Sequence, residues 1–197
     1  MKKLAYYRDK AIHGRNINIS TYPAGSDAIM IEGKLRDERL TSIFSITTGE
    51  RIGPGVVHEI VLRLLIRGAK LVIEDLEVEY LHMPRQQCHK TADSLMGLIG
   101  HTISPGFTSL VKKTFGGPRG CTHLNALLIS MAPAVVQGFW SMVASSPLTP
   151  AQVSGSMDAR FLIDSCWVWR SDGPLVREFQ EVLGAQGVTD HKGGQDK

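Results

Sequence analysis

The sequence predicts an α+β fold in which an antiparallel β-sheet is covered on one face by helices. Apolar and polar residues alternate over residues 15–35 and again over 56–82, which is the period of half-buried strands. From Cys88 onward the apolar residues recur every three or four positions, which is the period of helices. At 197 residues, 43% of them hydrophobic, the chain is long enough for one well-buried core. We therefore expect a single domain over residues 1–183 and a flexible polar tail over 184–197.

The first part of the chain predicts a β-hairpin. Strict alternation over residues 15–20 and renewed alternation over 29–35 flank the turn-forming segment 23–27, which contains proline, glycine and aspartate. Residues 41–55 are rich in glycine and threonine, so they predict a loop that leads into the next strand.

A second hairpin is predicted over residues 56–82, with its turn at 67–70. One face of its first strand carries His58, Ile60, Leu62, Leu64 and Ile66, and the other carries Glu59, Arg63 and Arg67. The returning strand separates Leu76, Val78, Tyr80 and His82 from Glu77 and Glu79 in the same way. Because strand side chains alternate between faces, His58 is expected to point to the side that the helices cover.

The second half predicts three helices and a last strand. Short helices are expected around residues 95–99 and 107–111. A long helix follows from Leu124, with apolar residues at spacings of three and four, and we expect it to be the central buried helix. Residues 161–169 predict a final strand that places Cys166 in the core.

Composition and charge exclude several classes of function. The formal net charge is only +3, and the basic residues are scattered, so we expect no nucleic-acid binding. The basic start of the chain is not followed by an apolar run, and the apolar stretch over 124–144 is broken by polar residues and a proline, so we expect neither a signal peptide nor a membrane span. The protein is therefore expected in the cytoplasm, where its three cysteines should be thiols or metal ligands rather than disulfides.

Two of the cysteines lie where a thiol has chemistry to offer. Cys121 opens the long helix, where unpaired backbone N–H groups and the helix dipole favour a thiolate, and His123 follows two residues later. Cys88 lies just after the proline that ends the second hairpin, although free cysteines also pack as small hydrophobes. Sulfur and imidazole together predict a soft-metal site, for which the candidate ligands are His58, Cys88, Cys121 and His123 and the candidate metals are zinc and iron.

Further side chains are candidates for acid–base work beside this site. His13, Arg15 and Glu59 are candidate auxiliary catalytic groups, with Cys121 as a candidate nucleophile. Asp37 is also a candidate general base, but charged residues on sheet faces usually face solvent.

Several short motifs follow one another along the chain. The most specific is Gly-Cys-Thr-His-Leu, which begins at Gly120. The others are His13-x-Arg15, Glu32-Gly-x-Leu35-x-Asp37, His58-Glu59, Pro84-x-x-x-Cys88, Asp164-Ser-Cys166 and Ser171-Asp-Gly-Pro174. In these motifs the chain resembles a bacterial domain-of-unknown-function family over nearly its whole length. That resemblance implies a shared fold and site but brings no activity with it.

The layout of residues 57–140 also resembles the NifU/IscU-type iron–sulfur scaffold. On this resemblance Cys88 and Cys121 fall at or near scaffold ligand positions, and His58 lies near the place of the first scaffold cysteine. The scaffold's first Cys-Gly-Asp is absent, and Gly120 replaces the histidine before the last scaffold cysteine. Two cysteines and two histidines are better suited to a zinc site or a histidine-substituted cluster than to an all-cysteine cluster.

We therefore expect a metal-centre protein with a Cys/His site. A metal-dependent enzyme acting on a small molecule is the first expectation, with the ion activating water or polarising a carbonyl. Four protein ligands would leave the ion no open position, which would indicate a structural or carrier role instead. The first alternative is an iron–sulfur cluster or sulfur carrier with a protein partner for cluster transfer. The second is a metal-free thiol enzyme that uses Cys121.

Overall fold

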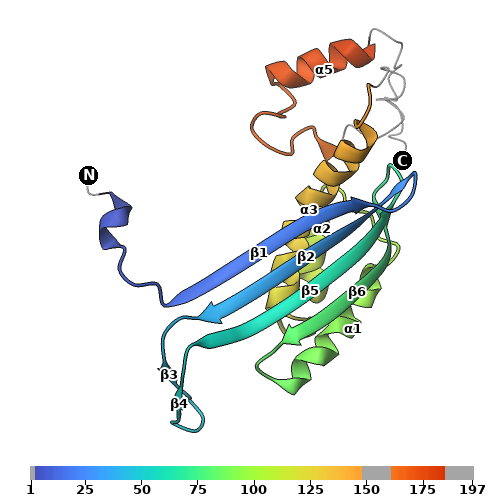
Figure 1. Ribbon diagram of the computed structural model, residues 1–197. Coiled ribbons are helices and arrows are strands. Elements are labelled where there is room, and N and C mark those ends of the chain that lie inside the picture. Colours follow the sequence, from blue (N-terminus) through green and yellow to red (C-terminus); the bar gives the residue numbers. More distant parts are fainter. Residues whose placement is uncertain (1–2, 148–160, 185–197) are drawn as a thin grey trace, which may run out of the picture.

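A four-stranded antiparallel sheet in the order β1-β2-β5-β6 forms the centre of the computed structural model, which describes residues 3–147 and 161–184 (Figure 1). The strands are β1 (His13–Pro23), β2 (Ala28–Arg39), β5 (Gly55–Arg67) and β6 (Val72–His82). The two expected hairpins supply the pairs β1–β2 and β5–β6, and β2 pairs with β5 to join them. The predicted α+β class is therefore confirmed.

Residues 40–54 form a small hairpin where the sequence predicted a loop. Strands β3 (Ile43–Phe44) and β4 (Arg51–Ile52) are only two residues long and pair with each other outside the main sheet. They extend from the end of the sheet where β2 stops and β5 begins (Figure 1). This hairpin therefore borders one end of the sheet without adding a strand to it.

Three α-helices lie behind the sheet and cover one of its faces (Figure 1). They are α1 (Ala92–Leu95), α2 (Phe107–Phe115) and α3 (Thr122–Val143). Short 3-10 helices accompany them at Gln86–Thr91, Met96–Leu98 and Gly117–Arg119, and another lies near the start of the chain at Leu4–Tyr7.

The C-terminal part differs from the prediction. Residues 161–169 form turns instead of a last strand, and Cys166 is exposed rather than part of the core. Helix α5 (Pro174–Gly184) follows, which the sequence did not predict. The expected polar tail lies, apart from its first residue, outside the described residues.

The helix-facing side of the sheet carries the core. Ile60 is 1% exposed and Leu62 is fully buried. Arg63, which directly follows Leu62, lies on the other face. The predicted strand faces are therefore confirmed. The buried side chains of α3 that meet the sheet and the other helices are Leu124, Leu127, Leu128, Met131 and Val135. Each fully buried Leu or Ile contributes about 1.5–3 kcal/mol relative to an exposed one.

Helix α3 approaches β1 very closely at Gly138. A Cβ atom built at Gly138 would lie 2.5 Å from Oγ1 and Cγ2 of Thr21, which is closer than real Cβ contacts allow. Among the described residues α3 alone has the length and composition of a membrane span, and the core helix of a globular protein meets the same criteria. One third of its apolar window is buried inside the protein.

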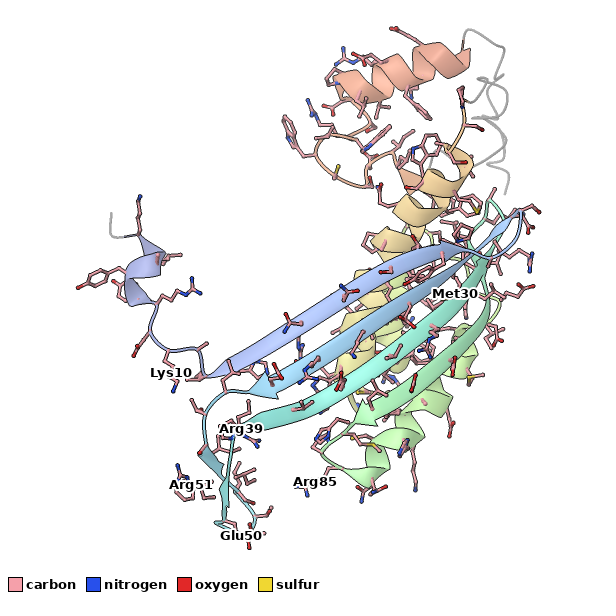
Figure 2. All side chains as sticks on the ribbon, in the orientation of Figure 1. Lys10, Met30, Arg39, Glu50, Arg51 and Arg85 are labelled. Atoms are coloured by element: carbon pink, nitrogen blue, oxygen red, sulfur yellow. The ribbon has the colours of Figure 1, made fainter. Side chains whose placement is uncertain are left out.

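The opposite face of the sheet carries side chains with nitrogen and oxygen atoms (Figure 2), and many of them form ion pairs. We call this set the outer-face ladder, and its members are Glu32, Lys34, Arg36, Glu38, Glu59, Arg63, Glu77 and Glu79. Arg63 Nε lies 2.6 Å from Glu32 Oε2, and Lys34 Nζ lies 2.7 Å from Glu59 Oε1. The ladder keeps this face polar, so the sheet has one covered face and one face open to solvent.

Candidate functional site

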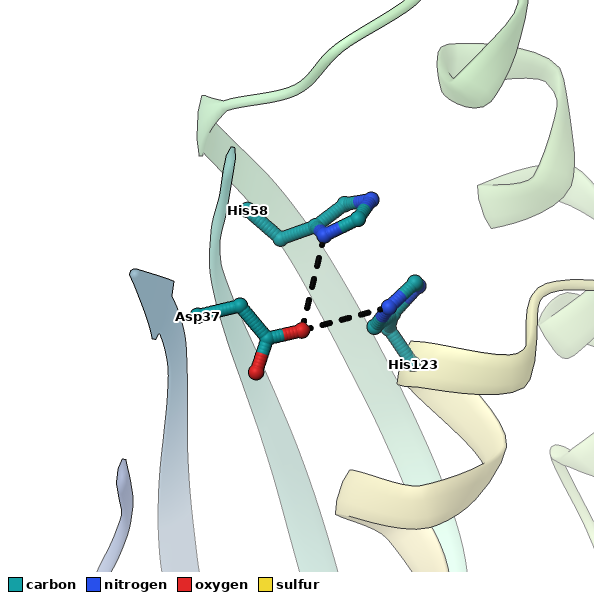
Figure 3. A group of neighbouring side chains, drawn as sticks. All are labelled: Asp37, His58 and His123. Atoms are coloured by element: carbon teal, nitrogen blue, oxygen red, sulfur yellow. Dashed lines mark ion pairs between the residues drawn. The ribbon is translucent and has the colours of Figure 1, made fainter. Parts of the chain in front are cut away.

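Three polar side chains meet on the helix-covered face, near the end of the sheet that borders the β3–β4 hairpin. They are Asp37 of β2, His58 of β5 and His123 of α3 (Figure 3), and we call them the Asp-His-His cluster. Oδ2 of Asp37 lies 3.5 Å from Nδ1 of His58 and 3.3 Å from Nε2 of His123. The two imidazole rings stack with their centroids 3.6 Å apart. One carboxylate oxygen therefore faces two ring nitrogens.

The pairing of β2 with β5 explains how Asp37 and His58 become neighbours. The two residues are direct cross-strand partners, so their side chains project from the same face. The register then shifts, because Glu38 pairs with Val56 and leaves Val57 as an extra residue. Such a β-bulge bends and twists the strand locally, and bulges are frequent beside functional sites.

Arg15 holds the buried carboxylate of Asp37. The side chain of Asp37 is only 3% exposed, and Arg15, its partner on β1, donates Nε at 2.6 Å and a terminal nitrogen at 2.7 Å. This two-pronged bond is the main reason that the pKa of Asp37 lies below its ordinary value. His13 is more distant, with Nε2 3.9 Å from Oδ1 of Asp37. Asp37 is thus an anchored, ionised carboxylate.

Both imidazoles of the cluster favour the neutral state. Burial is the largest cause that lowers the pKa of His58 and of His123, and it outweighs the opposing charge of Asp37. Nδ1 of His58 is buried, and its contact with Oδ2 of Asp37 at 3.5 Å lacks the geometry of a hydrogen bond. A neutral imidazole nitrogen without a partner is the form of histidine that binds a metal ion.

The turn between α2 and α3 places the start of α3. Its glycines are required by close packing, because a Cβ at Gly116 would meet the carbonyl oxygen of Lys112 and one at Gly120 would meet that of Phe115. Asn125, nearly buried, donates Nδ2 to the same Phe115 carbonyl at 2.7 Å. The glycines of this turn are therefore needed for packing, and the turn fixes the position from which His123 enters the cluster.

Cys121 adjoins the cluster through His123. It is the N-cap residue of α3, immediately before the helix that was expected to contain it. Its Sγ lies 3.8 Å from Nδ1 of His123, while Nε2 of the same ring faces Asp37. Cys121 therefore contacts the ring nitrogen that points away from the other two members.

The remaining predicted residues lie at different distances from this centre. Cys88 lies in the 3-10 helix that follows β6, and its thiol and that of Cys121 are both close enough to the Tyr80 hydroxyl to raise its pKa, although burial raises it more. Glu59 lies on the outer face, where Lys34 and Arg36 pair with it. The structure thus brings His58, His123 and Cys121 together, adds Arg15 and His13 around Asp37, and places Glu59 on the other side of the sheet.

Asp37 is the member that sequence reasoning undervalued. It was considered as a general base, but charged residues on strands were expected to face solvent. A signal was present, because Ile31, Leu35 and Asp37 have the same parity along β2 and the first two are apolar. A carboxylate on the apolar face of a strand needs a buried partner, and Arg15 supplies it.

The spacing of the three donor atoms fits a metal ion. They lie within 4.8 Å of one another. Ligand atoms at 2.0–2.1 Å from a tetrahedral ion are separated by about 3.3 Å, close to the observed distances from Asp37. Two histidines and one carboxylate suit zinc or iron(II) and leave coordination positions open. No thiol belongs to this group within the part of the chain that the structure describes.

Fold and site together define an α+β protein with a partly buried Asp-His-His cluster between its sheet and its longest helix. The chain belongs to the family described as protein of unknown function (DUF2889), whose model matches residues 13–137, more than half of the sequence. The matched segment includes Arg15, the whole Asp-His-His cluster and Cys121. No curated protein and no solved structure matches the chain, and the resemblance to the NifU/IscU scaffold is not confirmed.

Proposed function

We propose that the protein is a metal-centre protein in which Asp37, His58 and His123 hold one zinc or iron ion, and that it is an enzyme acting on a small molecule there. The observation that carries this proposal is the convergence of Oδ2, Nδ1 and Nε2 of these residues, two of them at 3.3 and 3.5 Å from the third. Three protein ligands, rather than four, leave a position open for a substrate or water.

The neighbouring side chains have defined tasks in such a centre. A zinc or iron ion would supply Lewis-acid chemistry, by polarising a carbonyl or lowering the pKa of bound water. Arg15 keeps Asp37 ionised and orients Oδ2 toward the two imidazoles. Cys121 lies against Nδ1 of His123, where it favours the orientation that aims Nε2 at the ion.

The sequence led us to expect Cys88 and Cys121 as metal ligands, and the proposed centre gives both thiols a different place. We assign Cys121 to the orientation of His123 rather than to direct ligation, because its sulfur faces the far nitrogen of the ring. Cys88 lies on the Tyr80 side of the site. An iron–sulfur carrier would have to be built on these two thiols and not on the three converging atoms, so we favour the mononuclear centre.

Metal binding tests the proposal directly. The chain is purified without added metal, its metal content is measured, and Co²⁺ is titrated into metal-free protein while visible absorption is followed. We expect one ion per chain, and a loss of affinity of at least about 100-fold in His58→Ala and in His123→Ala, because each removes a ligand.

His101→Ala is the matched control, since His101 is exposed and lies outside the cluster. We expect its affinity for Co²⁺ to equal that of the unmodified protein. Equal affinity in the unmodified chain and in a His58→Ala/His123→Ala double variant would rule out the proposed centre.

A second candidate function has its own support. Cys121, His123 and Asp37 form a chain in which the thiol lies 3.8 Å from one ring nitrogen and the carboxylate 3.3 Å from the other. This is the order of nucleophile, base and orienting carboxylate in cysteine-dependent enzymes. A metal-free thiol enzyme is therefore the alternative that the geometry favours next.

Thiol reactivity and metal affinity separate the two candidates. In a thiol enzyme, His123→Ala should slow alkylation of Cys121 by iodoacetamide in metal-free protein while leaving Cys88 unchanged. In a metal centre, Cys121→Ser should still bind one ion per chain, with an affinity reduced by about 10- to 100-fold because only an orienting contact is lost. Absence of stoichiometric metal binding in the unmodified chain together with a strong effect of His123→Ala on alkylation would favour the thiol enzyme.

A further inference from the structure

A pocket of about 390 Å³ lies at the end of the sheet where β2 stops and β5 begins. The β3–β4 hairpin forms one wall, and the segment that follows β6 forms another. Figure 2 labels Arg39, Glu50 and Arg85, which belong to its lining. Its volume falls in the range of about 300–1,000 Å³ that is common for small-molecule sites.

The lining combines positive charge with apolar surface. Arg39, Arg85 and His82 bring basic groups, whereas Glu50 is the carboxylate of the lining. Nε and one terminal nitrogen of Arg39 bond to the carbonyl oxygen of Gly53, which leaves its other terminal nitrogen available. No partner for the Arg85 side chain is found among residues 3–147 and 161–184.

The apolar part of the pocket comes from the same end of the sheet. Ile52, Val56, Val57 and Pro84 line it. A molecule that fills this space would thus meet hydrocarbon walls and, at one or more points, a guanidinium group. Such a surface suits an anionic group on a short apolar body, because guanidinium binds carboxylate or phosphate with two parallel hydrogen bonds.

The pocket adjoins the cluster along three strands. Val57 directly precedes His58 on β5, and Arg39 lies two residues beyond Asp37 on β2. His82 at the end of β6 is close enough to His58 for its charge to lower the pKa of that imidazole. A molecule bound in the pocket would therefore lie within one or two residues of His58 and Asp37 along β5 and β2.

We propose that this pocket binds the anionic group, carboxylate or phosphate, of a small molecule with a short apolar body and presents that molecule to the Asp-His-His cluster. The second half of this statement rests on the proposed metal centre, while binding of the anion does not. Arg85 is the residue on which recognition depends most, since its guanidinium has no competing partner in the described part of the chain.

Calorimetric titration of the full chain with three probes tests the anion site. The probes are hexanoate, hexanamide as its uncharged counterpart, and inorganic phosphate. We expect hexanoate or phosphate to bind and hexanamide not to bind, and the preferred anion tells carboxylate from phosphate. Arg85→Gln should weaken binding by at least about tenfold, because a charge-assisted hydrogen bond is lost.

Arg51→Gln is the matched control. Arg51 lies on the β3–β4 hairpin that forms one wall of the pocket, and it carries the same charge as Arg85, but it does not line the pocket. We expect its affinity for the anion to stay within about twofold of the unmodified chain, as is usual for a screened surface charge. Equal binding of hexanoate and hexanamide, unchanged binding in Arg85→Gln, or no binding of either anion at millimolar concentration would overturn the proposal.

The same titrations keep this inference separable from the metal centre. Anion binding that persists in His58→Ala/His123→Ala supports the pocket even where Co²⁺ no longer binds. Co²⁺ binding without anion binding would leave the metal centre standing and remove the pocket. In Co²⁺-loaded protein we expect the anion to change the visible spectrum, and an unchanged spectrum at saturation would refute the claim that the bound molecule approaches the cluster.

Discussion

The two faces of the sheet both carry charged side chains, but in opposite surroundings. On the outer face Arg36 pairs with Glu38 and Glu59, and the side chain of Arg36 is 39% exposed. On the inner face Arg15 has a similar exposure of 38%, but its partner Asp37 is 3% exposed. Outer pairs gain and lose little because Arg36 and Glu38 stay in contact with water and Glu59 keeps Lys34 as a second partner. The inner pair includes a carboxylate that has given up its water, so it depends on its partner.

This difference separates structural charge from functional charge. The outer-face ladder satisfies itself with neighbouring side chains and keeps the open face polar. In the inner cluster, Asp37 is satisfied by Arg15, yet Nδ1 of His58 is buried without a hydrogen-bond partner. A buried polar atom left without a partner costs stability, and a metal ion at Nδ1 of His58 would remove that cost.

The largest expected effect comes from removing the partner of the buried carboxylate. Arg15→Met should lower the free energy of unfolding by about 3 kcal/mol or more, because Asp37 would remain buried without its counter-charge. Arg36→Met on the outer face makes the same change where water is available, and we expect about 1 kcal/mol or less. Urea unfolding of both variants measures the difference. Equal losses would show that the two faces do not differ as described.

A second, smaller effect tests how tightly α3 covers the inner face. Gly138→Ala should cost about 1–3 kcal/mol, because the new methyl group overlaps the side chain of Thr21. Gly53→Ala is the control, since a Cβ at Gly53 meets nothing within 4 Å. Thermal unfolding of both variants is sufficient. A Gly138→Ala protein as stable as Gly53→Ala would mean that α3 is free to move away from β1.

The third prediction concerns pH and the metal-free protein. The pKa values of His58 and His123 are lowered from 6.5 by burial. Below pH 6.5 the unfolded chain therefore binds protons that the folded protein does not, and stability falls as the pH falls through this region. Above pH 6.5 both imidazoles are neutral in both states and the effect vanishes.

Urea unfolding of metal-free protein between pH 5 and pH 8 measures this dependence, where pH 5–8 is about the range in which histidine titrates. The double variant His58→Gln/His123→Gln should lose most of the slope below pH 6.5. His89→Gln/His101→Gln, which changes two exposed histidines, should retain it. A slope that survives in the first variant and disappears in the second would place the responsible groups outside the cluster.

The smallest effect is expected on the outer face. Arg63→Met removes the cation that pairs with Glu32, Glu77 and Glu79, yet we expect a loss of only about 1 kcal/mol or less, decreasing further in high salt. Unfolding in low and high salt checks both statements. A loss as large as that of Arg15→Met would mean that the outer-face ladder is as sensitive to the removal of one partner as a buried pair.

The local elements were well predicted where periodicity is strong. Alternation along residues 58–66 identified a strand and its buried face, because a slip by one residue would bury the Arg63 guanidinium. The apolar spacing after Leu124 identified α3 as the central helix for a similar reason. The β3–β4 hairpin was missed because its strands have two residues each, too few for a period to show. Helix α5 was missed although Leu175, Val176, Phe179 and Val182 recur at helical spacing.

The candidate site was predicted only in part. His58 and His123 were selected from the sequence, and the structure brings them together, whereas Cys121 contacts the cluster from its edge and Glu59 lies on the opposite face. Alternation alone placed Glu59 opposite to His58, because neighbouring residues of a strand point to opposite faces. That observation was available before the structure and argued against a shared role.

The sequence by itself determined the strands and the faces of the second hairpin and the central helix, because these depend on the periods of nearby residues. The tertiary structure alone decided that Asp37, His58 and His123 meet. Their encounter depends on the register between β2 and β5 and on how closely α3 lies against the sheet. Both result from packing between segments far apart in the chain, which no local pattern encodes.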